Sequence, residues 1–271
     1  GGYTAPAVFE RLNAEVVELY FELDGTFPNH EANPIEPANL VDLQKAVKKH
    51  KADIGLAFDG DADRCFLVDE KGALVNPSAL TALIATRELA KNPGASIIYN
   101  LISSRAVKEV VEESGGTAIR SRVGHSYIKK LMAETNAVFG GEHSGHFYFR
   151  DFWRADSGML AALHAIAALG ESKKSLSELL KAFNRYHSSG EINSTVKDAT
   201  SAMKKIEEIY GSGDGVEVDH LDGLTVSHAD WWFNLRASNT EPLLRLNVEA
   251  SAKSRMESMR DDVLNTIRSK G

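Results

Sequence analysis

The sequence predicts an α/β fold in which two mixed-sheet α/β units, the first of them truncated, are followed by a smaller α+β C-terminal domain. Segments with strand and helix periodicity alternate up to residue 187, as they do in α/β units. The chain opens on the turn-like pair Gly1-Gly2, and the strand that such a turn follows is missing from the first unit. After residue 214, strand-like segments follow one another without intervening helices. We therefore place the domains at residues 1–74, 75–187 and 188–271.

The size and composition of the chain narrow its class. At 271 residues it is long enough for two or three domains, and 43% hydrophobic with 25% charged residues is typical of a globular protein. A net charge of −7 disfavours nucleic acid as a partner, and no apolar run is long enough for a membrane helix. The single cysteine, Cys65, excludes an internal disulfide framework and fits a reducing cytoplasm, where we expect the protein to act.

The first unit is expected to alternate helix and strand. Hydrophobic periodicity predicts helices over residues 6–12 and 39–51 and a strand over residues 15–22. Two apolar runs, residues 54–58 and 65–68, flank a tight acidic loop and predict a strand–loop–strand segment.

The middle unit is expected to be a second alternating α/β layer. The run Asn76-Pro77-Ser78 marks a helix start and a domain boundary, and Gly115-Gly116 ends a later helix. The predicted helices cover residues 79–91, 103–113, 126–134, 155–169 and 176–186. The predicted strands cover residues 96–100, 117–121, 137–140 and 147–149.

The last unit begins with a change in the character of the sequence near residues 187–190 and has an α+β pattern. The predicted helices cover residues 199–210 and 253–270, and the predicted strands cover residues 215–218, 224–227, 231–236 and 243–248.

The acidic loop between the first two predicted strands indicates a metal site. Asp59, Asp61 and Asp63 alternate with small residues, so their carboxylates can converge on one point. Two carboxylates about 4 Å apart repel each other by roughly 4 kcal/mol at an effective dielectric near 20, and a divalent cation reverses that sign. Ligands that are all oxygen suit Mg²⁺ or Ca²⁺ rather than zinc. The alternative is a solvated acidic hairpin without metal.

Two other acidic motifs fit this loop less well. An EF-hand would use the three aspartates and Glu70, but it needs glycine at its sixth position, where Arg64 stands, and no helix leads into the loop. An aspartyl-phosphatase loop expects threonine or valine where Cys65 stands. Calcium sensing and a nucleophilic aspartate are therefore disfavoured, and Cys65 is interpreted as a small core residue.

Residues 122–130 (RVGHSYIKK) are expected to carry a strand into a helix. Gly124 permits a sharp turn, and the N-terminus of the following helix favours an anion. Arg122 adds positive charge, and His125 is a candidate for proton transfer or for contact with a phosphoryl oxygen. The alternative is that His125 merely makes a hydrogen bond at the helix start.

Residues 140–146 (GGEHSGH) place a carboxylate, a hydroxyl and two imidazoles between glycines. This set suits the binding of sugar hydroxyls by Glu142 and Ser144, with His146 as a proton-transfer group. A zinc site and an ordinary polar loop are the alternatives, and ligands this close in sequence lack a persuasive zinc geometry.

Residues 236–242 (RASNTEP) lead from a strand into a turn and predict an anion site. Arg236 can clamp a phosphate with its forked donors, and Arg245 on the next strand adds charge. Further donors come from Ser238, Asn239 and Thr240. A turn without a ligand is an equally good reading of this segment taken alone.

Taken in order, DGDADR, GEHSGH and RASNTEP resemble the motifs of the α-D-phosphohexomutases, with bacterial phosphomannomutase/phosphoglucomutase as the most similar branch. The resemblance covers essentially the whole chain. It implies four domains around a deep cleft, three of a related α/β type and a last one of α+β type. It also implies transfer of a phosphoryl group between the 1- and 6-positions of a hexose phosphate, through a phosphoserine and a hexose 1,6-bisphosphate.

The resemblance also implies roles for the candidate residues. The three aspartates would hold Mg²⁺ against the phosphoserine, and Arg64 would assist the phosphoryl group. His146 or His125 would help in proton transfer. Sugar hydroxyls would be gripped by Glu142 and Ser144, and the phosphate that is not transferred would be bound by Arg236, Ser238, Asn239 and Thr240.

One departure from the family pattern is large. The family's first domain carries its serine within a motif of the type T-A-S-H-N-P, and the only echo here is Ser227-His228 in a different context. The chain therefore resembles a fragment: the end of domain two with all of domains three and four. We expect the missing N-terminal domain to be its partner and the chain alone to bind but not to turn over. The alternative is a sugar-phosphate-binding or interaction module without catalysis.

Overall fold

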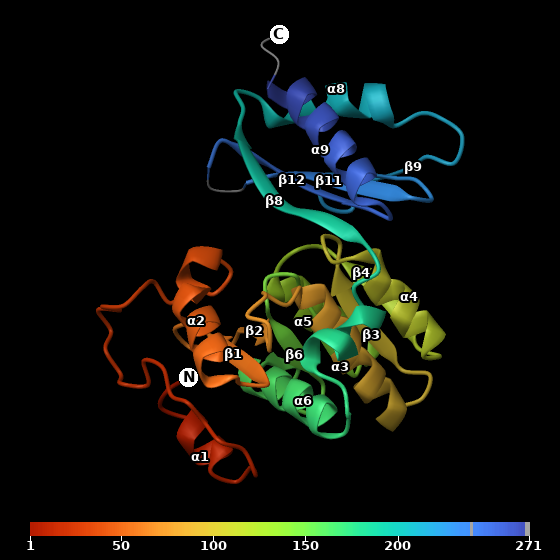
Figure 1. The fold of residues 1–271 in the computed structure, drawn as a ribbon. Coiled ribbons are helices and arrows are strands. Elements are labelled where there is room, and N and C mark those ends of the chain that lie inside the picture. The colour runs from red at the N-terminus through yellow and green to blue at the C-terminus, as the bar shows by residue number, and fades with distance from the viewer. Residues whose placement is uncertain (239–240, 269–271) are drawn as a thin grey trace.

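The computed structural model describes residues 1–238 and 241–268, whose strands form three sheets (Figure 1). The helices are α1 (Ala5–Phe9), η1 (Pro37–Leu40), α2 (Val41–His50), α3 (Pro77–Lys91), α4 (Arg105–Glu113), α5 (His125–Thr135), α6 (Gly158–Gly170), α7 (Leu176–Leu179), η2 (Leu180–Ala182), α8 (Ala199–Tyr210) and α9 (Lys253–Arg268). The strands are β1 (Ile54–Phe58), β2 (Cys65–Asp69), β3 (Ser96–Asn100), β4 (Thr117–Ser121), β5 (Phe139–Gly141), β6 (Phe147–Phe149), β7 (Ala155–Asp156), β8 (His187–Thr195), β9 (Glu217–Asp219), β10 (Leu224–Ser227), β11 (Trp231–Ala237) and β12 (Leu243–Ala250).

The predicted strand–loop–strand segment is the antiparallel hairpin β1–β2, with Phe58 opposite Cys65. Cys65 and Leu67 are buried in one cluster with Leu80 of α3, so the hairpin shares its core with the middle unit. The prediction that Cys65 is a core residue is confirmed, because only 1% of its surface is exposed. The same burial raises the pKa of its thiol well above the ordinary value.

The N-terminal stretch departs from the prediction. Residues 15–22 form no strand, and none of the sheets within residues 1–238 and 241–268 includes them. Tyr20 has a left-handed φ of 56°, which interrupts an extended run. Val16 and Val17 are each more than 40% exposed, so the alternating pattern has no sheet to bury it. The first predicted helix is also shorter, because α1 ends at Phe9.

The middle sheet is mixed, as predicted, with strand order β4-β3-β5-β6-β7. Strands β4, β3 and β5 are parallel, and β6 and β7 complete the sheet antiparallel. Helices cover both faces. On one face α3 and α6 bury Ile97, and on the other Ile98 and Tyr148 pack against Ile128 and Met132 of α5. Because the carboxyl ends of parallel strands meet at one edge, the loops that follow β4 and β5 lie at the same edge.

Three predicted helices of this unit are shorter than expected. The helix expected from residue 103 begins at Arg105, because the Ser104 side chain caps it. The helix expected from residue 155 begins at Gly158, because residues 155–156 pair with β6 and the Ser157 side chain caps the helix by accepting the backbone N–H of Leu160. The helix expected over residues 176–186 ends early, as α7 followed by η2.

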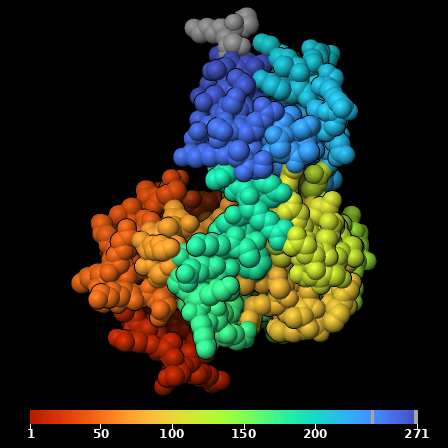
Figure 2. Space-filling view, turned by 45° about the vertical axis from the view of Figure 1, so that its right-hand side comes forward, coloured from red at the N-terminus to blue at the C-terminus, as the bar shows by residue number. Residues whose placement is uncertain are grey.

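The C-terminal unit is a five-stranded antiparallel sheet of order β8-β12-β11-β10-β9, with α8 and α9 on one face. Alternation along β12 buries Leu244, Leu246 and Val248 under the helices. Strand β8 was not predicted, since its residues HSSGEINST are polar and its order comes from pairing with β12. This unit sits as a separate lobe on the rest of the chain (Figure 2). Within the described residues, no helix is long and apolar enough to cross a membrane.

We predict that the α3–α6 packing makes the fold acid-sensitive. His164 Nε2 lies 3.4 Å from Glu88 Oε1, its ring stacks on Phe149, and burial lowers the pKa of His164 to about 4. Unfolded histidine has a pKa near ~6.5, so this stability is complete above that pH and is lost as the pH falls toward the folded value.

Between pH 7 and pH 5, wild type should lose about 2 kcal/mol more unfolding free energy than His164→Gln, whose neutral side chain takes up no proton. Urea denaturation at the two pH values measures this difference. Equal losses in the two proteins would show that His164 does not carry the effect.

Candidate active site

The acidic loop between β1 and β2 is held from within by Arg64. The Asp59 carboxylate accepts the Arg64 backbone N–H at 3.1 Å and its Nε–H at 2.7 Å, and Arg64 Nη1 donates to Asn33 at 3.1 Å. Burial of Asp59 favours its neutral form, but the hydrogen bonds and charge of Arg64 outweigh burial and hold the pKa of Asp59 below its ordinary value. The Asp59 carboxylate is therefore ionised and held in a fixed orientation.

The three predicted carboxylates converge. Asp59, Asp61 and Asp63 each offer an oxygen atom, and these atoms all lie within 4.8 Å of one another. Ala62 adopts a left-handed φ of 63°, which turns the chain between the last two aspartates. Burial, together with the charges of Asp59, Asp61 and Asp156, raises the pKa of Asp63 to about 7. This oxygen-only set with excess negative charge fits a hard divalent cation such as Mg²⁺.

The predicted hydroxyl-binding loop, residues 140–146, lies directly against the acidic loop. Arg64 and His146 form an antiparallel bridge, and the Cys65 N–H donates to the Gly145 carbonyl at 3.1 Å. Gly145 has a φ of +88°, and a Cβ there would lie 2.3 Å from the Phe66 ring. Only glycine allows this approach, so the two loops form one site.

His146 occupies the centre of this junction. Its Nδ1 lies 2.9 Å from Ser144 Oγ, and its Nε2 lies 3.5 Å from Asp63 Oδ1. Burial lowers the pKa of His146, although the charges of Glu142 and Asp156 oppose that shift. Burial thus favours the neutral imidazole, whose unprotonated nitrogen can accept a proton.

Glu142 is a buried anchor of this loop, with only 2% of its surface exposed. Its carboxylate accepts hydrogen bonds from Tyr148 Oη at 2.8 Å, from the Gly124 N–H at 3.0 Å and from Asn100 at 3.4 Å. These bonds tie the loop after β5 to the turn after β4 and leave little acceptor capacity for a ligand.

Two charged residues lie at this site for which the sequence predicted no role. Asp156 Oδ2 lies 4.0 Å from His146 Nε2, and Lys129 Nζ pairs with Asp156 Oδ1 at 2.9 Å and lies over the Tyr148 ring. Asp63, His146 and Asp156 thus form a second group that could hold a cation. The one local signal was the position of Asp156 just before the cap of α6.

The turn of residues 122–124 makes a sharp bend, as predicted, with Gly124 at a φ of 128° and His125 starting α5. His125 is exposed. Arg122 lies over the Tyr127 ring at 4.7 Å, and its Nη2 lies 3.9 Å from Asp222. The hydrogen bond from Gly124 to Glu142 connects this turn to the hydroxyl-binding loop.

The predicted anion site lies on the C-terminal sheet. Arg236 and Arg245 are directly opposite each other on β11 and β12, and both approach Glu191, at 3.8 and 3.3 Å. Arg245 Nη2 also donates to Ser238 Oγ at 3.5 Å. Two facing guanidinium groups that share one carboxylate retain positive charge for an anion.

The residues Asn239 and Thr240 of the same predicted site lie outside the described residues. The structure joins residues 59–64, 122–125 and 142–146 through direct contacts, whereas the ion pairs of the two arginines stay within the C-terminal sheet.

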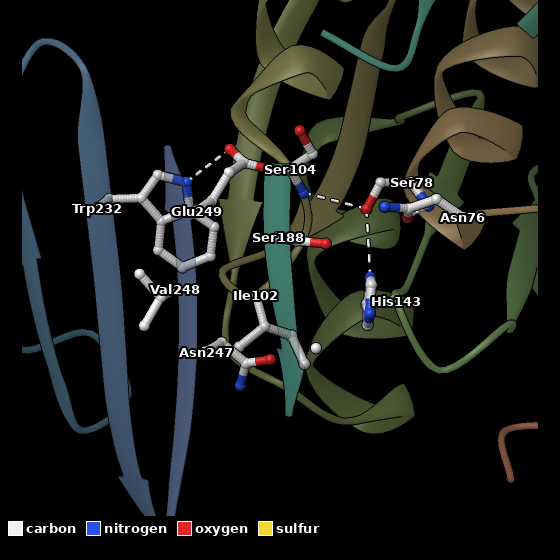
Figure 3. A pocket seen from close by; sticks show the side chains of 11 residues that line it. Asn76, Ser78, Ile102, Ser104, His143, Ser188, Trp232, Asn247, Val248 and Glu249 are labelled. Atoms are coloured by element: carbon white, nitrogen blue, oxygen red, sulfur yellow. Dashed lines mark hydrogen bonds between the residues drawn. The ribbon is translucent and has the colours of Figure 1, made fainter. Parts of the chain in front are cut away.

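A small cavity lies where the two lobes meet (Figure 3). Ser78 Oγ accepts the Ser104 N–H at 3.0 Å and lies 3.3 Å from His143 Nδ1, while Glu249 accepts the Trp232 Nε1–H at 2.7 Å. The cavity of about 10 Å³ has room for no more than a single water, so it is part of the lobe interface rather than a ligand site.

Comparison with known proteins assigns each part of the chain to a family model. Residues 1–72 match "Phosphoglucomutase/phosphomannomutase, alpha/beta/alpha domain II", and residues 76–186 match the alpha/beta/alpha domain III of the same family. Residues 191–266 match its C-terminal domain.

The similar proteins are longer than this chain. Phosphomannomutase of Methanocaldococcus jannaschii is 45% identical over 244 residues, 90% of this chain and 54% of that protein. Phosphomannomutase of Escherichia coli is 42% identical over 264 residues, 96% of this chain and 58% of that protein. The crystal structure of a phosphoglucomutase/phosphomannomutase family protein from Burkholderia thailandensis superposes with a TM-score of 0.88 at 34% identity, covering 100% of this chain and 59% of that one. The chain thus spans somewhat more than half the length of these relatives.

We predict that Asp63→Asn stabilises the metal-free protein and removes its response to Mg²⁺. The substitution deletes a carboxylate whose raised pKa reflects repulsion, so the apo melting temperature should rise by a few degrees, for about 1 kcal/mol. Thermal denaturation with and without Mg²⁺ measures both effects.

Asp53→Asn, which removes an exposed charge just before β1, is the matched control and should behave as wild type. A variant at Asp63 that still gains the wild-type stabilisation from Mg²⁺ would remove this residue from the metal site.

Proposed function

Because the chain belongs to the phosphoglucomutase/phosphomannomutase family, we propose that it carries the metal, sugar and phosphate loops of a phosphohexomutase. Such an enzyme interconverts hexose 1-phosphate and hexose 6-phosphate through a phosphoserine and a hexose 1,6-bisphosphate. The observation that carries this proposal is the direct junction of the acidic loop with the hydroxyl-binding loop, through the Arg64–His146 bridge.

The acidic loop is proposed to hold Mg²⁺ through Asp59, Asp61 and Asp63. When bound there, the ion would neutralise negative charge on a transferring phosphoryl group. Arg64 orients Asp59 and presents its guanidinium beside the same point, so it is proposed to assist that group. The repulsion that raises the pKa of Asp63 supports a site that needs a cation.

Proton transfer is proposed for His146. Its neutral imidazole lies between Ser144 and Asp63, at the junction where a sugar hydroxyl would meet the phosphoryl group. Ser144 is proposed to contact sugar hydroxyls, and Glu142 to do so with the acceptor capacity that its own hydrogen bonds leave. His125, exposed at the start of α5, is the second candidate for proton transfer.

The phosphate that is not transferred is proposed to bind on the C-terminal sheet. Arg236 and Arg245 face each other there, and Ser238 lies beside them. Arg122 is proposed to meet the substrate at the other lobe. Holding the sugar phosphate at both ends positions the reacting hydroxyl, which lowers the entropic part of the barrier.

The phosphoserine is proposed to come from a domain outside residues 1–271, which is the proposed partner of this chain. The greater length of the relatives supports this view.

The division of the chain into domains at residues 74/75 and 187/188 is likewise proposed, with support from the separate C-terminal core. The single buried cysteine supports a cytoplasmic location.

The proposed phosphate clamp predicts a specific loss of affinity. Arg236→Ala should weaken the binding of glucose 1-phosphate, measured by calorimetry, by about tenfold or more, because a charge-assisted contact is lost. Arg260→Ala, which removes an arginine paired with its neighbour Asp261 on α9, should leave the affinity unchanged. Equal affinities for both variants would argue against the clamp.

Because the phosphoserine is proposed to lie in another domain, we predict that this chain alone does not turn over a hexose phosphate. With mannose 1-phosphate and a hexose 1,6-bisphosphate activator, no conversion to the 6-phosphate should be detected, although the sugar phosphate binds. Robust turnover by this chain would contradict the proposal that the phosphoserine lies elsewhere. A sugar-phosphate-binding module without catalysis would also bind and not turn over. Turnover that appears after the N-terminal domain is added would show that the chain is part of an enzyme and not such a module.

A further inference from the structure

Asp222 is a carboxylate of the C-terminal lobe that binds the backbone of the other lobe. Its Oδ2 accepts the Val123 N–H at 3.1 Å, and its Oδ1 lies 3.9 Å from Arg122 Nη2. The side chain is 15% exposed, so it is largely shielded from solvent. Asp222 follows β9, whose Asp219 forms an ion pair with Arg120 at the end of β4.

The tip that carries Asp222 is anchored to the C-terminal sheet by backbone contacts. The Asp222 carbonyl accepts a hydrogen bond at 3.1 Å from Asn234 Nδ2, and Asn234 is fully buried. Gly223 has a φ of +76°, and a Cβ there would lie 2.1 Å from the Leu235 carbonyl oxygen. The backbone position of Asp222 is therefore set by the core of its own lobe.

Two carboxylates from different parts of the chain bind successive amides of one turn. Asp222 binds the Val123 N–H, and Glu142 binds the Gly124 N–H at 3.0 Å. Glu142 Oε2 lies 3.7 Å from His146 Nδ1, and the opposite ring nitrogen lies 3.5 Å from Asp63. A continuous series of contacts therefore connects the C-terminal lobe to the acidic loop.

We infer that Asp222 is a positioning residue, which holds the turn before His125 in register with Glu142 and so couples the placement of the C-terminal lobe to the hydroxyl-binding loop. The inference rests on the proposed function only for the roles assigned to the acidic and hydroxyl-binding loops. The contacts of Asp222 and Glu142 themselves involve no ligand. If the lobe moves away, Val123 loses its acceptor, and the neighbouring Gly124–Glu142 bond loses its support. A freed Glu142 would gain acceptor capacity for hydroxyls.

A second contact holds the lobe independently of Asp222. Arg105, at the start of α4, donates to the carbonyls of His228, Ala229 and Trp231 at 2.7 to 3.2 Å, and its backbone N–H donates to Glu249 at 3.0 Å. Changing Asp222 should therefore leave the lobe docked, so that local effects at the turn can be measured.

Amide hydrogen exchange of the full chain, followed by NMR, tests this inference without metal or substrate. In Asp222→Ala, exchange at Val123 and Gly124 should accelerate by about tenfold or more, because a hydrogen bond to a charged acceptor is lost. The amide resonances of residues 142–146 should shift as well. Asp222→Asn keeps an oxygen acceptor and should restore most of the protection.

Asp219→Asn is the matched control, since it removes the charge that pairs with Arg120 but keeps an oxygen that can accept the Leu221 N–H in the turn carrying Asp222. The exchange of Phe233, in the buried strand β11, should be unchanged in every variant. The inference is overturned if Asp219→Asn accelerates Val123 and Gly124 as much as Asp222→Ala does. It is also overturned if Asp222→Ala affects Val123 but leaves Gly124 and residues 142–146 as in wild type.

Discussion

The crowding of negative charge around one short loop governs the rest of this structure. Arg64 compensates Asp59, and Lys129 compensates Asp156, whereas Asp63 lies close to Asp61 and has the imidazole of His146 beside it at 3.5 Å. At an effective dielectric near 20, two carboxylates about 4 Å apart repel each other by roughly 4 kcal/mol. The fold tolerates this arrangement because β2, on one side of the loop, is buried in the core shared with α3, and a divalent cation would turn the repulsion into attraction.

Close backbone contact converts this charged loop into a site. Gly145 meets the Phe66 ring, and a Cβ on Gly158 would lie 2.4 Å from the Arg64 carbonyl oxygen. Any side chain at these two positions would push the hydroxyl-binding loop and α6 away from the acidic loop. The distance between His146 and Asp63 therefore depends on two glycines that perform no chemistry themselves.

The two ends of a sugar phosphate would be held by different lobes. The acidic and hydroxyl-binding loops belong to the lobe with the mixed sheet, and Arg236 and Arg245 belong to the antiparallel sheet of the other. The contacts of Arg105 and Asp222 set how these lobes sit on each other. The position of Arg236 and Arg245 relative to the acidic loop therefore depends on the lobe interface as well as on the loops.

The sequence by itself determined the chemistry of the loops and most local elements, because carboxylate spacing, helix periodicity and turn residues act over short stretches. It did not reveal that residues 15–22 lack a sheet partner or that the polar residues of β8 pair with β12. Nor could it place Asp156 beside His146, or Asp222 on the amide of Val123. Tertiary structure decided these points, because each depends on groups distant in sequence that only the packed core brings together.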